Sequence, residues 1–193
     1  MSSRNVRKLW TEKLSQGHLK RKNRAGLPNM MQRNYKGTVL GLDISLRGTG
    51  LAIVKFDQRI PTLVMSDRIS CPAKLSFFQC IHAIFARIAE VLSQYHVDSV
   101  AIEQTIYVQN YKISHILGAA KGAAIAAIMQ HTLPIVEYEP LRIKQAVTGF
   151  GRAGKEQVRK TISAILNIKN DMSYDESDAA AAAICHAWTT IND

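Results

Sequence analysis

Four acidic residues carry the strongest chemical signal in this chain. Asp43 ends the apolar run GTVLGLD, and Glu103 ends the apolar run DSVAIE. If the two runs form adjacent parallel strands, both carboxylates meet at one edge of the sheet. Asp175 and Asp178 have i, i+3 spacing, so they share a face if that segment is helical. Each acid taken alone also has a structural interpretation, because acids often end strands or complement the N-terminus of a helix.

A cluster of these carboxylates predicts a metal site. Bringing the acids together costs on the order of several kcal/mol in a site of low dielectric constant unless cations compensate. Ligands that are all oxygen suit Mg²⁺, with Mn²⁺ as the alternative ion. A pair of such ions can stabilise the attacking and the leaving oxygen of a phosphodiester displacement. The acids therefore favour a nuclease that uses two metal ions.

The stretch GFGRAGKEQVR, residues 149–159, fits both the dinucleotide pattern G-x-G-x-x-G and most of the Walker pattern. A nucleotide loop should leave a strand and open a helix. Here the preceding PLRIKQAV predicts a helix, and Glu156 stands where a magnesium-binding Ser or Thr is needed. What remains is a glycine turn at a helix N-terminus, where Arg152 and Lys155 could bind a phosphate. The alternative is a plain turn with solvated charges.

The elements around these residues predict an α/β fold with a mixed sheet and helices on its faces. The apolar patterns alternate between short runs typical of strands and longer segments with a helical period. Ser173 and Glu176 have the spacing of a capping box and predict the start of the last helix. Strands are expected over 37–44, 49–56, 60–69, 98–104 and 133–140, and helices over 76–95, 111–130, 141–148, 155–167 and from 173 onward.

The composition predicts one domain with a basic extension. The chain has 193 residues, of which 47% are hydrophobic, and a formal net charge of +10. Residues 1–36 hold ten of the 25 Lys and Arg but one of the 15 acids, so residues 37–193 are close to neutral with fifteen against fourteen. We expect residues 1–36 to be a flexible extension that can bind phosphates without reading sequence, and residues 37–193 to form the nuclease domain.

The sequence also bears on the cellular compartment. Three cysteines without a CxxC pair indicate neither a zinc site nor a disulfide framework, which favours a reducing interior. No apolar run reaches the roughly 18 residues of a membrane span. The Arg- and Lys-rich N-terminus is also typical of an organelle transit peptide, so the bacterial cytoplasm and an organelle matrix both stay open.

Five ordered motifs together resemble the bacterial RuvC Holliday junction resolvases over about residues 38–188. The resemblance implies an RNase H-like fold, a mixed five-stranded sheet with helices on both faces, and a homodimer. It also implies magnesium-dependent, symmetrical nicking of two opposed strands at four-way DNA junctions during recombination and repair. The RuvAB branch-migration complex would be the family's usual partner. The motifs are LGLDISLRGTGLAI, VAIEQTIYVQN, LGAAKGAAIAA, VEYEPLRIKQAVTGFGRAGKEQV and DESDAAAAAICHAW.

The resemblance assigns roles to residues of this chain. The family's acidic ligands fall on Asp43, Glu103, Asp175 and Asp178, which it implies are both catalytic and metal-binding. Its basic residues near the scissile phosphate fall on two lysines. Lys155 is implied to be catalytic and to offset transition-state charge, and Lys144 to bind DNA, together with Arg152 and with Arg47, which keeps the family pattern after the first acid.

Three features depart from the family pattern. Ile44 and Ser45 replace the usual Pro-Gly after the first acid, so the following loop is expected to differ. The aromatic residue that contacts bases at the crossover falls on Ile106, with Tyr107 beside it, so either an aliphatic wedge or a stacking ring engages the DNA. The basic extension is the third departure.

Other functions stay open at this stage. An RNase H-like nuclease that acts on structured RNA would use the same carboxylates, and a non-catalytic junction-binding protein would use the same basic residues. An ATPase of the actin or sugar-kinase type shares the hairpin pattern LGLDISLRGTGLAIV, but this chain is short for its two lobes.

Overall fold

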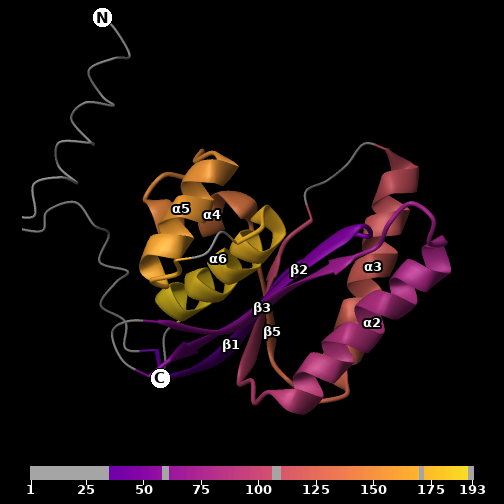
Figure 1. Cartoon of the computed structure of the whole chain (residues 1–193), viewed down its shortest axis with the longest axis horizontal. Helices are drawn as coiled ribbons and strands as arrows, with labels where there is room; N and C mark the ends of the chain where they lie inside the picture. The colour runs from indigo at the N-terminus through magenta and orange to yellow at the C-terminus, as the bar shows by residue number, and fades with distance from the viewer. Residues whose placement is uncertain (1–34, 58–60, 106–109, 170–171, 191–193) are drawn as a thin grey trace, which may run out of the picture.

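The computed structural model describes residues 35–57, 61–105, 110–169 and 172–190. These residues form one five-stranded sheet with helices on both faces, as expected (Figure 1). The strands are β1 (Gly37–Asp43), β2 (Gly48–Phe56), β3 (Thr62–Ser70), β4 (Ser99–Glu103) and β5 (Ile135–Tyr138), and the helices are α2 (Phe77–Gln94), α3 (Tyr111–Met129), α4 (Pro140–Thr148), α5 (Lys155–Ile165) and α6 (Tyr174–Thr189).

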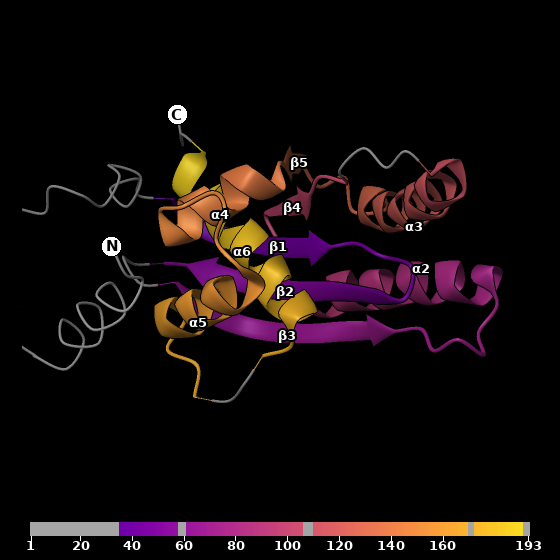
Figure 2. The same cartoon turned by 90° about the horizontal axis from the view of Figure 1, so that it is seen from above.

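The sheet is mixed, with the strand order β3-β2-β1-β4-β5 (Figure 2). The first three strands form an antiparallel meander, because short turns can return the chain directly to the neighbouring position. β4 pairs with β1 in parallel and β5 pairs with β4 in parallel, each after a helix. The predicted adjacent, parallel arrangement of the strands that carry Asp43 and Glu103 is therefore confirmed.

Helices cover the two faces of the sheet and create two cores. α4, α5 and α6 pack on one face, and α2 and α3 pack on the other (Figure 1). Alternate residues of β1 serve opposite cores, since Val39 belongs to the first cluster and Leu40 to the second. This explains why β1 reads as a continuous apolar run rather than as an alternation.

The glycine stretch joins two helices and does not follow a strand. α4 begins with Pro140 at its first position and ends at Gly149, whose φ of 76° is left-handed and suits a residue without a Cβ. Gly154 then caps α5. The sequence-based exclusion of a nucleotide loop at this position is therefore correct, because a strand–loop–helix arrangement is missing.

Helix α6 lies directly on the backbone of the sheet. A Cβ at Gly41 would overlap the carbonyl oxygen of Ala179, and a Cβ at Gly50 would overlap the carbonyl oxygen of Asp175. The run of alanines that follows Asp178 is fully buried at this contact. Small residues on both surfaces let the helix approach closely, which fixes the position of its first turn relative to β1 and β2.

One contact bears on the predicted boundary between the extension and the domain. Tyr35 already packs edge-on against Phe56 and His186, so the last residues of the predicted extension contact the body.

Among the described residues, α3 is the helix that is long and apolar enough to cross a membrane by length and composition alone. It packs beside α2 against the sheet, and its Lys121 forms a 2.6 Å ion pair with Glu137.

Candidate active site

Asp43 and Glu103 lie side by side at one edge of the sheet. In the parallel ladder Leu42 pairs with Ile102, so the next residue of each strand falls at the same level. Asp43 is the last residue of β1 and Glu103 is the last residue of β4. The register therefore brings together two carboxylates that are sixty residues apart in the chain.

The first two turns of α6 bring the other two acids to the same edge. The capping box of Ser173 and Glu176 starts the helix, with Ser173 Oγ accepting from the Glu176 amide at 3.2 Å. The close contact at Gly50 holds this turn over β2, so Asp175 and Asp178 lie next to Asp43. The predicted convergence of the acids thus has a cause in the packing of α6.

Burial and mutual repulsion raise the pKa values of Asp43, Glu103 and Asp178. The pKa of Asp43 is raised to about 6 by burial first, and then by the charges of Asp178 and Asp175. The pKa of Glu103 is raised to about 7, again by burial first and then by Asp43 and Asp178. Burial is also the main cause that raises the pKa of Asp178. Carboxyl groups whose pKa values are shifted by burial and by specific charged neighbours are typical of a functional site.

Two lysines of the neighbouring helices oppose this repulsion. Lys155, at the first position of α5, places Nζ 4.0 Å from Oδ2 of Asp178. The charges of Lys155 and Lys144 both favour the ionised forms of Asp178 and Glu103. The glycine turn is what directs Lys155 toward the acids, because it lets α5 start beside the end of α4. Arg152 lies exposed on the same turn.

Sequence reasoning missed an arginine that contacts the fourth acid. Arg68 of β3 forms an ion pair with Asp175 through Nε and Oδ2. The two residues are 107 positions apart, and Arg68 belongs to no motif that would single it out. It reaches the site because it pairs with Gly50 across the β2–β3 ladder and faces α6.

The turn after Asp43 is closed by side-chain hydrogen bonds, one of them from Ser45, which stands in place of the glycine of the expected Pro-Gly. Ser45 Oγ donates to the carbonyl of Gly48 at 3.0 Å, and Thr49 Oγ1 donates to the carbonyl of Ser45 at 2.6 Å. Nη1 of Arg47 donates to the carbonyls of Pro72 and Leu75 at 2.9 and 3.0 Å. Arg47 thus supports the loop before α2, and its predicted contact with DNA would have to use its other N–H groups.

The chemistry of the donor set suits hard divalent cations. The groups that converge are carboxylates, whose pKa values are raised by burial first and then by their mutual charges, and a bound cation would favour their ionised forms. Within the described ranges, no group of three or more His, Cys, Asp or Glu side chains is arranged so that it could hold a metal ion. Mg²⁺ does not require such a cage, since it commonly binds one or two carboxylates and completes its shell with water and substrate phosphate.

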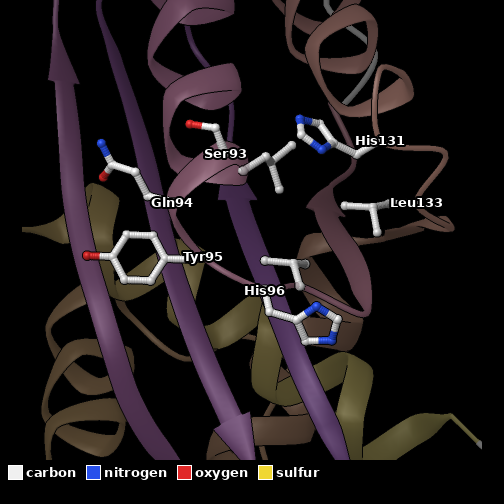
Figure 3. A pocket seen from close by; sticks show the side chains of 8 residues that line it. Ser93, Gln94, Tyr95, His96, His131 and Leu133 are labelled. Atoms are coloured by element: carbon white, nitrogen blue, oxygen red, sulfur yellow. The ribbon is translucent and has the colours of Figure 1, made fainter.

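Two pockets of the described structure lie away from the acids. One pocket opens at the C-terminal ends of α2 and α3, where Ser93, Gln94, Tyr95, His96, His131 and Leu133 line it (Figure 3). Another lies along the first half of α3. The four carboxylates are half-buried where β1 and β4 end and α6 begins. Ile106 and Tyr107, predicted to engage bases, lie outside the described residues.

The chain is similar to known proteins of one family. A family model described as "Crossover junction endodeoxyribonuclease RuvC" matches residues 39–186. The RuvC of Halorhodospira halophila is 39% identical over 149 residues, which cover 77% of this chain and 89% of that protein. The RuvC of Trichlorobacter lovleyi is 40% identical over 150 residues, with 77% and 83% covered. The structure of Thermus thermophilus RuvC in complex with Holliday junction substrate superposes with a TM-score of 0.74 at 27% identity, with 79% and 93% covered.

Proposed function

The chain belongs to the RuvC family of crossover junction endodeoxyribonucleases, and from this membership we propose how its own residues resolve a four-way DNA junction. The observation that supports the proposal is the convergence of Asp43, Glu103 and Asp178 at the open edge of the sheet, beside Lys144 and Lys155. The products would be two symmetrical nicks in opposed strands of the junction.

The carboxylates would hold the metal ions. Asp43, Glu103 and Asp178 would bind two Mg²⁺ ions, or Mn²⁺ in their place, with Asp175 as the fourth ligand. When bound, the ions supply an activated water nucleophile and stabilisation of the departing 3′ oxygen. Since the acids are half-buried or buried, they keep their mutual orientation while the substrate enters from the open side.

The basic residues bind and polarise the substrate. Lys155, which stands next to Asp178, offsets the negative charge that develops on the phosphate in the transition state. Lys144 and the exposed Arg152 bind neighbouring backbone phosphates, and the exposed Arg47 is a further candidate for DNA contact. Ile106 or Tyr107 engages the bases that the crossover leaves unpaired.

We further propose a homodimer that uses the outer face of α3. Gly118 and Gly122 have no atom within 4 Å of the position a Cβ would occupy, and Tyr111 and Ile113 expose apolar surface on the same helix. An apolar helix with small residues on its open side suits close packing against a second copy. A two-fold dimer would place two equal active sites on the two-fold-symmetric junction.

The cellular setting follows from the relatives. Those compared above come from bacteria, so we place this protein in the bacterial cytoplasm, with the RuvAB complex as its candidate partner. The relatives give no support to an RNA substrate or to a non-catalytic role. The division into a basic extension, residues 1–36, and a nuclease domain, residues 37–193, stays a prediction.

Cleavage of a synthetic junction tests the proposal. The purified protein is incubated with a four-way junction whose crossover is fixed, and separately with linear duplex, in Mg²⁺ or in EDTA. We expect paired, symmetrical, Mg²⁺-dependent nicks near the crossover on denaturing gels, and none in the duplex. Asp178→Asn should abolish the nicks, while the matched variant Asp67→Asn, which changes an acid paired with Arg87 outside the cluster, should keep them. Junction binding without nicks would overturn the catalytic assignment.

A further inference from the structure

Arg68 and Asp175 form an ion pair at the rim of the carboxylate cluster. The guanidinium contacts Oδ2 of Asp175 through Nε, with 48% of the Arg68 side chain and 25% of the Asp175 side chain exposed. Lys155 is the ion-pair partner of Asp178, so the two acids of α6 have different cationic partners from different parts of the fold. The carboxylate that would be the fourth metal ligand is therefore already occupied by a protein cation.

The fold makes a specific space for this pair. A Cβ at Gly48 would lie 2.8 Å from Nη2 of Arg68 and 2.9 Å from Oδ2 of Asp175, so the pair lies directly over the glycine. Gly48 does not have a positive φ, so its backbone does not require glycine. Residue 48 therefore lacks a side chain because the ion pair occupies the space, and not because the turn requires glycine.

Arg68 is not needed to dock α6 on the sheet. Ser66, two positions earlier on β3, donates from Oγ to Oε1 of Glu176 at 2.7 Å. The backbone of α6 also rests on Gly50. These contacts hold the first turn of the helix against β2 and β3, where its N-terminal end crosses the sheet (Figure 2). Another role is needed for an arginine that neutralises a catalytic carboxylate.

We propose that Arg68 is a displaceable counter-ion of Asp175, and this proposal rests on the metal-dependent function above. In the free enzyme the guanidinium competes with a divalent cation for the Asp175 carboxylate, so metal binding at this acid requires that the pair opens. The apparent metal affinity falls by the fraction of molecules in which Asp175 is available. Once displaced, the half-exposed guanidinium stands at the rim of the site, where a DNA phosphate can take the place of the carboxylate.

This arrangement makes metal loading and DNA binding support each other. A backbone phosphate that attracts Arg68 frees Asp175 for the cation, and a cation on Asp175 frees Arg68 for the phosphate. Coupling of this kind is reciprocal, because each ligand favours the same open state of the pair. Arg68 is then a positioning residue that delays completion of the metal site until the substrate is present.

Manganese binding to the DNA-free protein tests the proposal. Mn²⁺ is titrated into the wild type and into Arg68→Gln, with free Mn²⁺ followed by electron paramagnetic resonance. We expect about 1.5- to fivefold tighter binding in the variant, the range set by a partly exposed ion pair. Arg68→Lys, which keeps the charge, should return the affinity toward that of the wild type. Gly48→Ala, which crowds the pair without removing a charge, should shift the affinity in the same direction as Arg68→Gln.

Controls separate this role from a structural one. Arg87→Gln removes the same charge from a pair with Asp67 that lies outside the cluster, and it should leave Mn²⁺ affinity unchanged. In the Asp175→Asn background the gain from Arg68→Gln should vanish, because the competing carboxylate is gone. Weaker or unchanged Mn²⁺ binding in Arg68→Gln, with normal binding in the wild type, would overturn the role of Arg68 alone. A wild type that binds no Mn²⁺ would overturn the proposed metal site as well.

Discussion

Replacing Asp43 by asparagine should stabilise the metal-free protein at alkaline pH while it destroys activity. The pKa of Asp43 rises from its ordinary 3.8 to about 6 in the folded protein, chiefly because the carboxyl is buried. The folded state therefore binds more protons than the unfolded chain between these values. This contribution to stability is fully present below about pH 4 and is lost as the pH rises through about 6.

The structure gives the size of the effect. A change of pKa from 3.8 to about 6 corresponds to about 3 kcal/mol at a pH where the carboxylate is ionised. Asparagine has nearly the same shape and no charge, so it removes this cost. It also removes the charge that is the second cause of the raised pKa of Glu103. We expect Asp43→Asn to raise the free energy of unfolding by about 2–3 kcal/mol at pH 8, and by about 1.5 kcal/mol at pH 5, where the unfolded chain is already ionised and the folded carboxyl is not.

Urea unfolding followed by circular dichroism measures this difference. The wild type and Asp43→Asn are compared in EDTA at both pH values. The matched variant Asp67→Asn removes an acid that has an arginine partner at 2.8 Å, so it should be neutral or destabilising by up to about 1 kcal/mol. If Asp43→Asn is no more stable than the wild type at pH 8, the ionised Asp43 carboxylate does not destabilise the folded protein, and the reasoning is refuted.

Three further predictions follow from the same geometry. Saturating Mg²⁺ should raise the melting temperature of the wild type at pH 8 more than at pH 5, because protons compete for the carboxylates, and equal shifts in a thermal scan would contradict this. Gly50→Ala should lower the free energy of unfolding by about 2 kcal/mol or more, since its Cβ meets the carbonyl of Asp175, whereas Gly154→Ala, which faces open space, should cost less than about 1 kcal/mol. Lys155→Met should slow single-turnover junction cleavage about 10- to 100-fold with little change in junction affinity, while Lys160→Met, whose lysine pairs with Glu156 on the same helix, should cleave normally. Equal losses in both lysine variants would indicate a general charge effect.

Much of the site is already encoded in local sequence. The apolar runs that end at Asp43 and Glu103 predict strands, and the structure has both strands with the acids at their last positions. The Ser173–Glu176 capping box predicts the start of α6, and the structure has the helix there. The segment before Gly149 predicts a helix, which excludes a nucleotide loop. These inferences succeed because strand periodicity, caps and left-handed glycines depend on a few neighbouring residues.

Contacts between elements that are far apart in the sequence could not be predicted from local sequence patterns. Nothing near Arg68 in the sequence indicates that it meets Asp175, and nothing near Gly48 or Gly50 indicates that a helix lies on them. The raised pKa values of Asp43 and Glu103 likewise depend on burial by elements far away in the chain. The sequence by itself determined which residues are acids, the approximate extent of each strand and helix, and which family the chain resembles. The tertiary structure decided that Asp175 and Asp178 have cationic partners while Asp43 and Glu103 repel each other, because charge–charge energies depend on distances and burial that are fixed when α6 packs onto the sheet.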